Sequence, residues 1–392
     1  MSLTHPVAVS SVAFSPRPEA RTSDAIAIAR VLCILGVVYV HAWTGLDSGA
    51  LLALKGSGQE TLRWTLMETF GRSAVPLLGL ISGWLVAGSS RVRNFGPHVA
   101  HKARTILLPM LLWNAIAIIL VSGAALFAGL QAPVPHSAEW MAQELLILTR
   151  NPDINVQMPF LRDLFLCMVA APLLARAPNW MLASVAALAG GAFILGYGPP
   201  VLMRASILMF FAIGMIARRT GADTRVANLP WAVAVLPFLL LLPLKVHVSL
   251  PGNGFAVAHA QMLIAIDLSV RLAATLAMWR IACALAASGA STFLKRIEPY
   301  MFFMFCSHLI FMWLVAPMIG RLTGPLGSPA YPALLVLQPA LALASAAVLA
   351  KGLMLIAPEL AGILSGGRLK GSRPRIDGGT VMTRPVRLQP AR

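Results

Sequence analysis

Charged residues are scarce in this sequence. They make up 11% of the 392 residues, whereas 58% are hydrophobic and the mean hydropathy is +0.78. A soluble domain carries about 25% charged residues. The composition therefore excludes an ordinary soluble protein and favours a chain whose solvent is a lipid bilayer.

Cysteine and the common cofactor motifs are also scarce or missing. The four cysteines lie inside apolar segments at no metal-ligand spacing: Cys33, Cys167, Cys283 and Cys306. We expect them to be small core residues. The sequence contains no phosphate-binding glycine loop and no Ser-His-Asp order, so we expect no metal and no other cofactor.

Long polar segments are missing between the apolar ones. The longest stretches that we place outside the membrane, 45–69 and 129–158, are too short for separate catalytic domains. Any chemistry is therefore expected inside the helical bundle.

The dominant feature that is present is a series of apolar runs, each long enough to cross a hydrocarbon core of about 30 Å as a helix. They predict an all-α, polytopic integral membrane protein with about ten transmembrane helices. We place these near 25–44, 70–89, 105–128, 159–175, 180–196, 201–217, 229–244, 261–283, 300–320 and 331–350.

Three regions follow from this pattern. Residues 1–24 lack an apolar core, so we expect a cytoplasmic segment rather than a cleaved signal peptide. Residues 25–350 form the predicted transmembrane domain. Residues 351–392 are basic and are expected to be a disordered cytoplasmic tail near anionic lipid.

The distribution of Lys and Arg predicts the orientation. Cytoplasmic loops carry an excess of these residues, and the excess is greatest here if both termini are cytoplasmic. The net charge of +17 is then mainly topological, and nucleic acid is not an expected partner. The basic residues that set the bias between the predicted helices include Arg91, Arg93, Lys102, Arg104, Arg218, Arg219, Arg225, Lys295 and Arg296.

Ionisable residues inside the predicted spans are the candidates for function. Each costs roughly 2.5 to 3.5 kcal/mol on insertion scales and usually faces a bundle interior or a wet cavity. Arg162–Asp163 and Asp267–Arg271 are pairs that fit structural support and substrate contact equally well. The full set is Arg30, His41, Arg72, Arg162, Asp163, Asp267, Arg271, Arg280 and His308.

Arg30 and His41 are eleven residues apart in the first predicted helix. Eleven residues rotate by about 1100°, roughly 20° from three full turns, so both side chains are expected on one face about 16 Å apart. An imidazole can accept a proton from an attacking hydroxyl, and a guanidinium can hold a phosphate or thioester oxygen. A snorkelling arginine and an interfacial histidine fit the same spacing.

A wider set of residues resembles the membrane acyltransferase-3 family. Arg30 to His41 matches its R-x10-H signature, and GRSAVPLLGLISGWL is similar to its second-helix pattern. HKARTILLPMLLWN resembles the basic step before its third helix, and FLRDLFL and MFFAIGMIARR resemble later segments. His308, in FMFCSHLIF, stands where the family often has a histidine. The matches occur in order over residues 30–308.

The resemblance implies an inner-membrane enzyme, an acyltransferase transferring groups other than aminoacyl groups. It implies transfer from cytoplasmic acyl-CoA, a co-substrate, to a hydroxyl of a lipid-linked or periplasmic glycan. We identify no esterase-like domain at the carboxyl end of this sequence. In this respect the sequence looks closest to the family branch that performs exopolysaccharide O-acetylation or O-succinylation.

The resemblance also implies site roles. His41 acts as general base or transient acyl carrier and Arg30 guides the thioester. Lys102, Arg104, Arg91 and Arg93 bind the donor phosphates, although these four charges also suit topology alone. The remaining candidates are expected to line the substrate cavity: Arg72, Ser82, Arg162, Asp163, Asp267, Arg271 and His308.

Two alternatives remain at this point. A glycan or lipid exporter would use buried charges to line a translocation path, and two similar halves would favour it. We find no internal repeat. A scaffold for a polysaccharide synthase would make His41 dispensable. The sequence does not indicate the acyl group, the acceptor or the oligomeric state.

Overall fold

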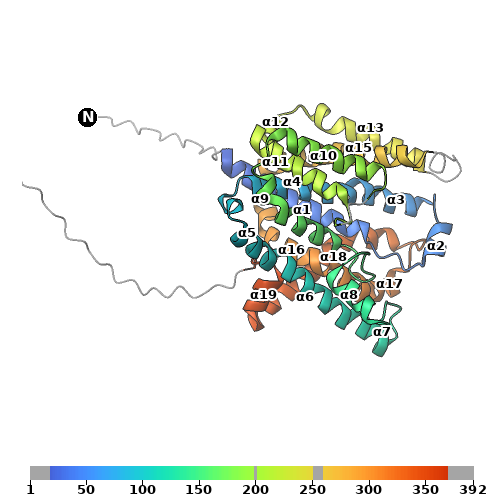
Figure 1. Cartoon of the computed structure of the whole chain (residues 1–392). Coiled ribbons are helices and arrows are strands. Elements are labelled where there is room, and N and C mark those ends of the chain that lie inside the picture. The colour runs from blue at the N-terminus through green and yellow to red at the C-terminus, as the bar shows by residue number, and fades with distance from the viewer. Residues whose placement is uncertain (1–17, 198–200, 250–258, 370–392) are drawn as a thin grey trace, which may run out of the picture.

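The computed structural model describes residues 18–197, 201–249 and 259–369. Every regular element within these residues is a helix, and the helices form one bundle (Figure 1). The prediction of an all-α, multi-pass membrane protein is confirmed.

The helices that match the predicted spans are as follows. The first three are α1 (Pro18–Val40), the pair η1 (Met67–Gly71) and α4 (Arg72–Ala87), and the run η3 (Ala103–Leu107), α6 (Leu108–Ala117), η4 (Ile118–Ser122) and α7 (Gly123–Ala128). The others are α9 (Pro159–Leu174), α10 (Asn179–Ile194), α11 (Ala205–Thr220), α13 (Trp231–Ser249), α15 (Ala260–Ala286), α16 (Ser291–Leu314) and α18 (Tyr331–Ile356).

Shorter helices connect them: α2 (Ser48–Ala53), α3 (Gly58–Leu66), η2 (Ser90–Arg93), α5 (Phe95–Lys102), α8 (Ala138–Leu146), α12 (Ala222–Ala227), α17 (Ala316–Thr323) and α19 (Pro358–Leu364).

Each predicted span thus corresponds to a helix, but the lengths differ. Seven helical stretches are long and apolar enough to cross a membrane. The other three, α9, α10 and α11, have 16 residues each. At 1.5 Å per residue this is about 24 Å, less than a hydrocarbon core of about 30 Å. The count of ten membrane crossings stays a prediction.

The carboxyl-terminal boundary differs from the expectation of a disordered tail from residue 351. α18 continues to Ile356, α19 follows, and the side chains of Leu364, Ser365 and Leu369 are buried. The reason is local hydrophobicity: Leu353, Met354, Ala361 and Leu364 pack on the bundle, and most of the basic residues of this region come later. Residues 370–392 lie outside the described residues.

α1 is the central helix of the bundle. It packs against η1, α4, α15, α16 and α18. Its approach to η1 is close because both partners present glycine: a Cβ on Gly36 would lie 2.3 Å from the carbonyl oxygen of Phe70. Small residues allow this kind of helix contact in membranes.

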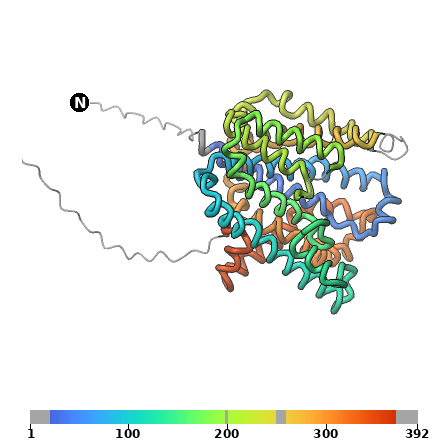
Figure 2. Tube along the Cα trace, viewed as in Figure 1, coloured from blue at the N-terminus to red at the C-terminus, as the bar shows by residue number. Residues whose placement is uncertain are grey.

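The described ends of the chain lie at the same end of the bundle. Figure 2 shows the start of α1 in blue and α19 in red on one side, and Figure 1 places α5 and α12 on that side too. The segments predicted to be cytoplasmic therefore gather at one end, as a common compartment requires. Which compartment it is rests on the charge bias.

Candidate active site

The first cavity surrounds Arg30 and has a volume of about 260 Å³. We call it the Arg30 cavity. Its walls come from α1, α4, α5, α9, α16 and the chain after α19, so segments distant in sequence meet there. The polar side chains that line it are Arg30, Ser82, Ser89, Arg91, His98, His101, Lys102, Thr105, Glu298 and Arg368.

Arg30 itself is held by an ion pair. Its Nη1 lies 3.1 Å from Glu298 Oε1, and both side chains are partly exposed. Because the pair uses one guanidinium nitrogen, the other donors stay available for a ligand. Ser82, on the same wall, donates its hydroxyl to the Leu78 carbonyl at 2.7 Å and so has its proton engaged within α4.

Arg368 is a wall residue that the sequence did not indicate, because it stands in the expected tail. Its guanidinium lies 4.1 Å from the ring centre of Phe302. Burial, with Arg30 nearby, lowers the pKa of Arg368 to about 10, so the group remains cationic at neutral pH. The carboxyl-terminal segment therefore adds a positive charge to the cavity.

The four predicted donor-binding residues do not all line the same cavity. Lys102 and Arg91 line the Arg30 cavity. Arg104 is exposed and does not, because two residues turn a helix by about 200° and point it to the opposite face. Arg93 borders a different groove with Arg176.

The second cavity surrounds His41 and has a volume of about 410 Å³. We call it the His41 cavity. His41 follows the last residue of α1 and its N–H donates to the Val38 carbonyl at 3.1 Å, so it stays in register with the helix. Its polar lining consists of His41, Arg72, Gln157, Tyr197, Arg204, Ser206 and Arg271.

The two cavities lie along one face of α1. Arg30 and Ile34 line the first, and Val37 and His41 line the second, in the i, i+4, i+7, i+11 order of a helical stripe. The shared face expected for Arg30 and His41 is therefore present.

Two aromatic residues separate the cavities. Phe160 and Phe305 line both, and their ring centres lie 5.8 Å apart at an interplanar angle of 65°. An edge-to-face pair of this kind is a stable apolar contact. Any group that moves from Arg30 to His41 must pass it.

His308 is adjacent to His41. The ring centres are 5.6 Å apart, and His308 is buried. Its Nδ1 lies 2.8 Å from the Phe305 carbonyl oxygen, which fixes Nδ1 as the protonated nitrogen. Nε2 is then an acceptor, and it is buried without a hydrogen-bond partner in the described part of the chain.

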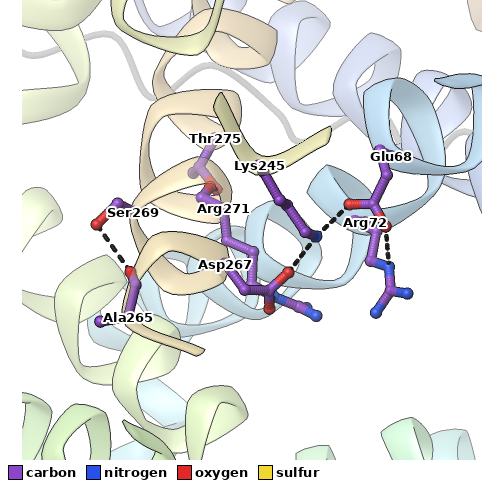
Figure 3. Close-up of polar contacts among 8 residues, drawn as sticks. All are labelled: Glu68, Arg72, Lys245, Ala265, Asp267, Ser269, Arg271 and Thr275. Atoms are coloured by element: carbon purple, nitrogen blue, oxygen red, sulfur yellow. Dashed lines mark hydrogen bonds and ion pairs between the residues drawn. The ribbon is translucent and has the colours of Figure 1, made fainter. Parts of the chain in front are cut away.

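A network of five charged residues adjoins the His41 cavity, and Figure 3 shows it. Lys245 bridges the carboxylates of Glu68 and Asp267. Arg72 Nε lies 2.8 Å from Glu68, and Arg271 Nε lies 2.6 Å from Asp267. The Asp267–Arg271 pair was expected from its i, i+4 spacing. Glu68 and Lys245 were missed because both lie just outside the predicted spans, which begin at residue 70 and end at residue 244, respectively.

The other predicted pair, Arg162–Asp163, makes contacts that support the fold. Asp163 is fully buried, pairs with Arg162 at 2.7 Å, and accepts the backbone N–H groups of Met203 and Arg204 at 3.2 and 2.8 Å. It thereby fixes the chain where α11 begins. Neither Arg162 nor Asp163 lines the two cavities.

A third, larger crevice of about 910 Å³ also reaches His41. We call it the Trp43 crevice. It lies at the opposite end of α1 from the Arg30 cavity, and its lining mixes indole rings with carboxyl, amide and basic groups: Trp43, Asp47, Gln131, Asp153, Trp313 and Arg321. The described residues contain no cluster of His, Cys, Asp or Glu suited to a metal ion.

Comparison with known proteins identifies the family of the chain. Residues 23–353 match a family model described as "Acyltransferase domain". The chain is 26% identical over 371 residues to the "Succinoglycan biosynthesis protein ExoH" of Rhizobium meliloti (strain 1021), which covers 91% of this chain and 95% of that protein. No solved structure matches.

Proposed function

Because the chain belongs to the membrane acyltransferase-3 family, we propose that it transfers an acetyl or succinyl group from cytoplasmic acyl-CoA to a hydroxyl of a glycan. The observation that carries the proposal is the row of three neighbouring spaces along α1. The cationic Arg30 cavity is followed by the Phe160–Phe305 pair, the His41 cavity and the Trp43 crevice.

Acyl-CoA suits the Arg30 cavity. The donor carries phosphates, and Lys102, Arg91 and Arg368 place positive charge at its walls. Arg30 then lies on the path toward His41 and can hold the thioester oxygen while Glu298 fixes its orientation. The orientation predicted from the charge bias places this cavity at the cytoplasmic face of the inner membrane.

The acceptor suits the Trp43 crevice. Indole faces pack against the C–H faces of sugar rings, and carboxylates and amides accept or donate to hydroxyl groups. Trp43 and Trp313 supply the indole faces. Asp47, Asp153 and Gln131 supply the carboxylates and the amide. The relative's role in succinoglycan biosynthesis supports an exopolysaccharide or its lipid-linked precursor as the acceptor.

Transfer requires His41 at the junction. The acceptor oxygen attacks the thioester carbonyl carbon, its proton passes to His41, and the C–S bond breaks to release CoA, which leaves as the thiol after protonation. His308 would assist, because its ring lies next to that of His41 and its Nε2 can accept a hydrogen bond. The same placement allows His41 to carry the acyl group transiently.

The test uses the complete chain. Surface glycans from cells with and without the protein are compared by mass spectrometry, and membranes from both are incubated with radiolabelled acetyl-CoA and succinyl-CoA. We expect ester-linked acyl groups only where the protein is present. Unchanged glycans together with export of an unacylated glycan would instead support the transporter alternative.

A further inference from the structure

The His41 cavity carries positive charge that the protein does not neutralise. Arg72, Arg204 and Arg271 line it, and no Asp or Glu is among the described residues of its lining. The adjoining network contains three cations, Arg72, Lys245 and Arg271, and two anions, Glu68 and Asp267. With Arg204 included, the cavity has an excess of two positive charges.

The nearest acid, Asp163, attracts Arg204 but is shared with Arg162. Asp163 accepts the backbone N–H of Arg204, but its carboxylate is paired with the guanidinium of Arg162. Within the described residues, the side chain of Arg204 makes no hydrogen bond or ion pair. Its guanidinium donors are therefore available to a ligand in the cavity that Arg204 lines.

The arginine donors are also arranged for a ligand. Arg72 and Arg271 each direct Nε at a carboxylate, which leaves both Nη atoms of each fork unused in the described part of the chain. Figure 3 shows the two guanidinium ends on the same side of the Lys245 bridge. The carboxylates therefore orient the forks without occupying them.

We propose that Arg72, Arg204 and Arg271 form an oxyanion site that binds a carboxylate or phosphate group while His41 acts on the reacting centre. The inference rests on the proposed acyl transfer and adds a substrate class: one reactant carries a negative charge within reach of His41. That charge is on the far end of a dicarboxylic acyl group, such as succinyl, or on an acidic substituent of the acceptor glycan.

Binding is measured first because it does not depend on turnover. The full-length protein in lipid nanodiscs is heated with succinate, inorganic phosphate or neutral succinamide. We expect succinate or phosphate, but not succinamide, to raise the Tm of the wild type, and Arg204→Gln to abolish the rise. Equal Tm values with and without both anions would overturn the site even if acyl transfer is observed.

Arg204→Gln is the primary variant because it breaks no ion pair, whereas Arg271→Gln also leaves Asp267 with less compensation. Arg280→Gln is the matched control. Arg280 lies on α15 nine residues after Arg271 and on the opposite face of that helix. Its Nε donates to the Leu229 carbonyl at 3.0 Å.

Kinetics then identify the source of the charge. Acetyl-CoA and succinyl-CoA are each paired with a neutral and a uronate-containing oligosaccharide. A charged hydrogen bond corresponds to roughly 10- to 100-fold in affinity, so Arg204→Gln should raise one KM by about that factor. A rise confined to succinyl-CoA identifies the acyl group, and one confined to the acidic oligosaccharide identifies the acceptor.

The overturning outcome is equally specific. If Arg204→Gln lowers transfer equally for all four pairs, or resembles Arg280→Gln in all of them, the arginines do not recognise an anion. A wild type that binds succinate or phosphate at this site but transfers neither acyl group would instead contradict the proposed function and leave the oxyanion site standing.

Discussion

His41 lies where the His41 cavity and the Trp43 crevice are adjacent, since it lines both. Arg30 is confined to the other side of the Phe160–Phe305 pair. In the proposed reaction, α1 and the residue after it thus carry a donor-side group, Arg30, and an acceptor-side group, His41. The Phe160–Phe305 pair lies between Arg30 and His41 and keeps the two side chains in separate cavities.

Replacement of His41 by alanine should reduce glycan acylation by about 10²- to 10⁴-fold, the usual contribution of a general base. The protein should still insert, because His41 lies beyond the last turn of α1 and makes, within the described residues, a single hydrogen bond, from its backbone N–H to the Val38 carbonyl. Acylated glycan is quantified at equal membrane abundance. Near wild-type acylation would place the chemistry elsewhere.

Lys102 and Arg104 provide a paired test of donor binding. Lys102→Ala should raise the KM for acyl-CoA with a smaller change in kcat, because it removes binding that substrate and transition state share. Arg104→Ala should leave this KM near the wild-type value, since Arg104 points away from the Arg30 cavity. An equal effect of both substitutions would indicate that these charges serve topology or long-range attraction only.

At the scale of elements, the contact between α4 and α11 holds the site together. A Cβ on Gly83 would lie 2.0 Å from the carbonyl oxygen of Phe211, and one on Gly214 would lie 2.0 Å from that of Leu80. The two glycines therefore let each backbone touch the other. This explains two of the motifs that carried the family resemblance, SGW in α4 and the glycine-centred α11.

Gly83→Ala should therefore destabilise the protein by roughly 1 to 3 kcal/mol, the range for overpacking in a well-packed core. Gly191→Ala in α10 is the control, because an added Cβ there meets nothing within 4 Å and alanine favours the helix. Thermal unfolding of the two variants in the same nanodiscs compares them. If Gly83→Ala is as stable as Gly191→Ala, the close approach does not matter for stability.

At the scale of the whole molecule, the described ends of the chain share one side of the bundle with α5 and α12 (Figure 1). Reporter fusions after Arg104, Arg219 and Arg296 should therefore give one common signal, which the charge bias predicts to be cytoplasmic. Fusions near Ser57 and His136 should give the opposite signal. A fusion near Gly252 tests the same prediction at a position outside the described residues. An external signal after Arg104 would reverse the donor and acceptor sides.

The sequence by itself determined the membrane setting, the helices, the common helix face of Arg30 and His41 and the Asp267–Arg271 pair. The physical reason is that hydrophobic runs and charges within them are local features, so the sequence alone shows where they lie. Tertiary structure decided which charges meet. Lys245 joins Glu68 and Asp267 over 177 and 22 residues, and Arg368 reaches the Arg30 cavity from beyond the predicted domain. Such contacts depend on how helices pack, and spacing along one helix carries no information about a partner on another.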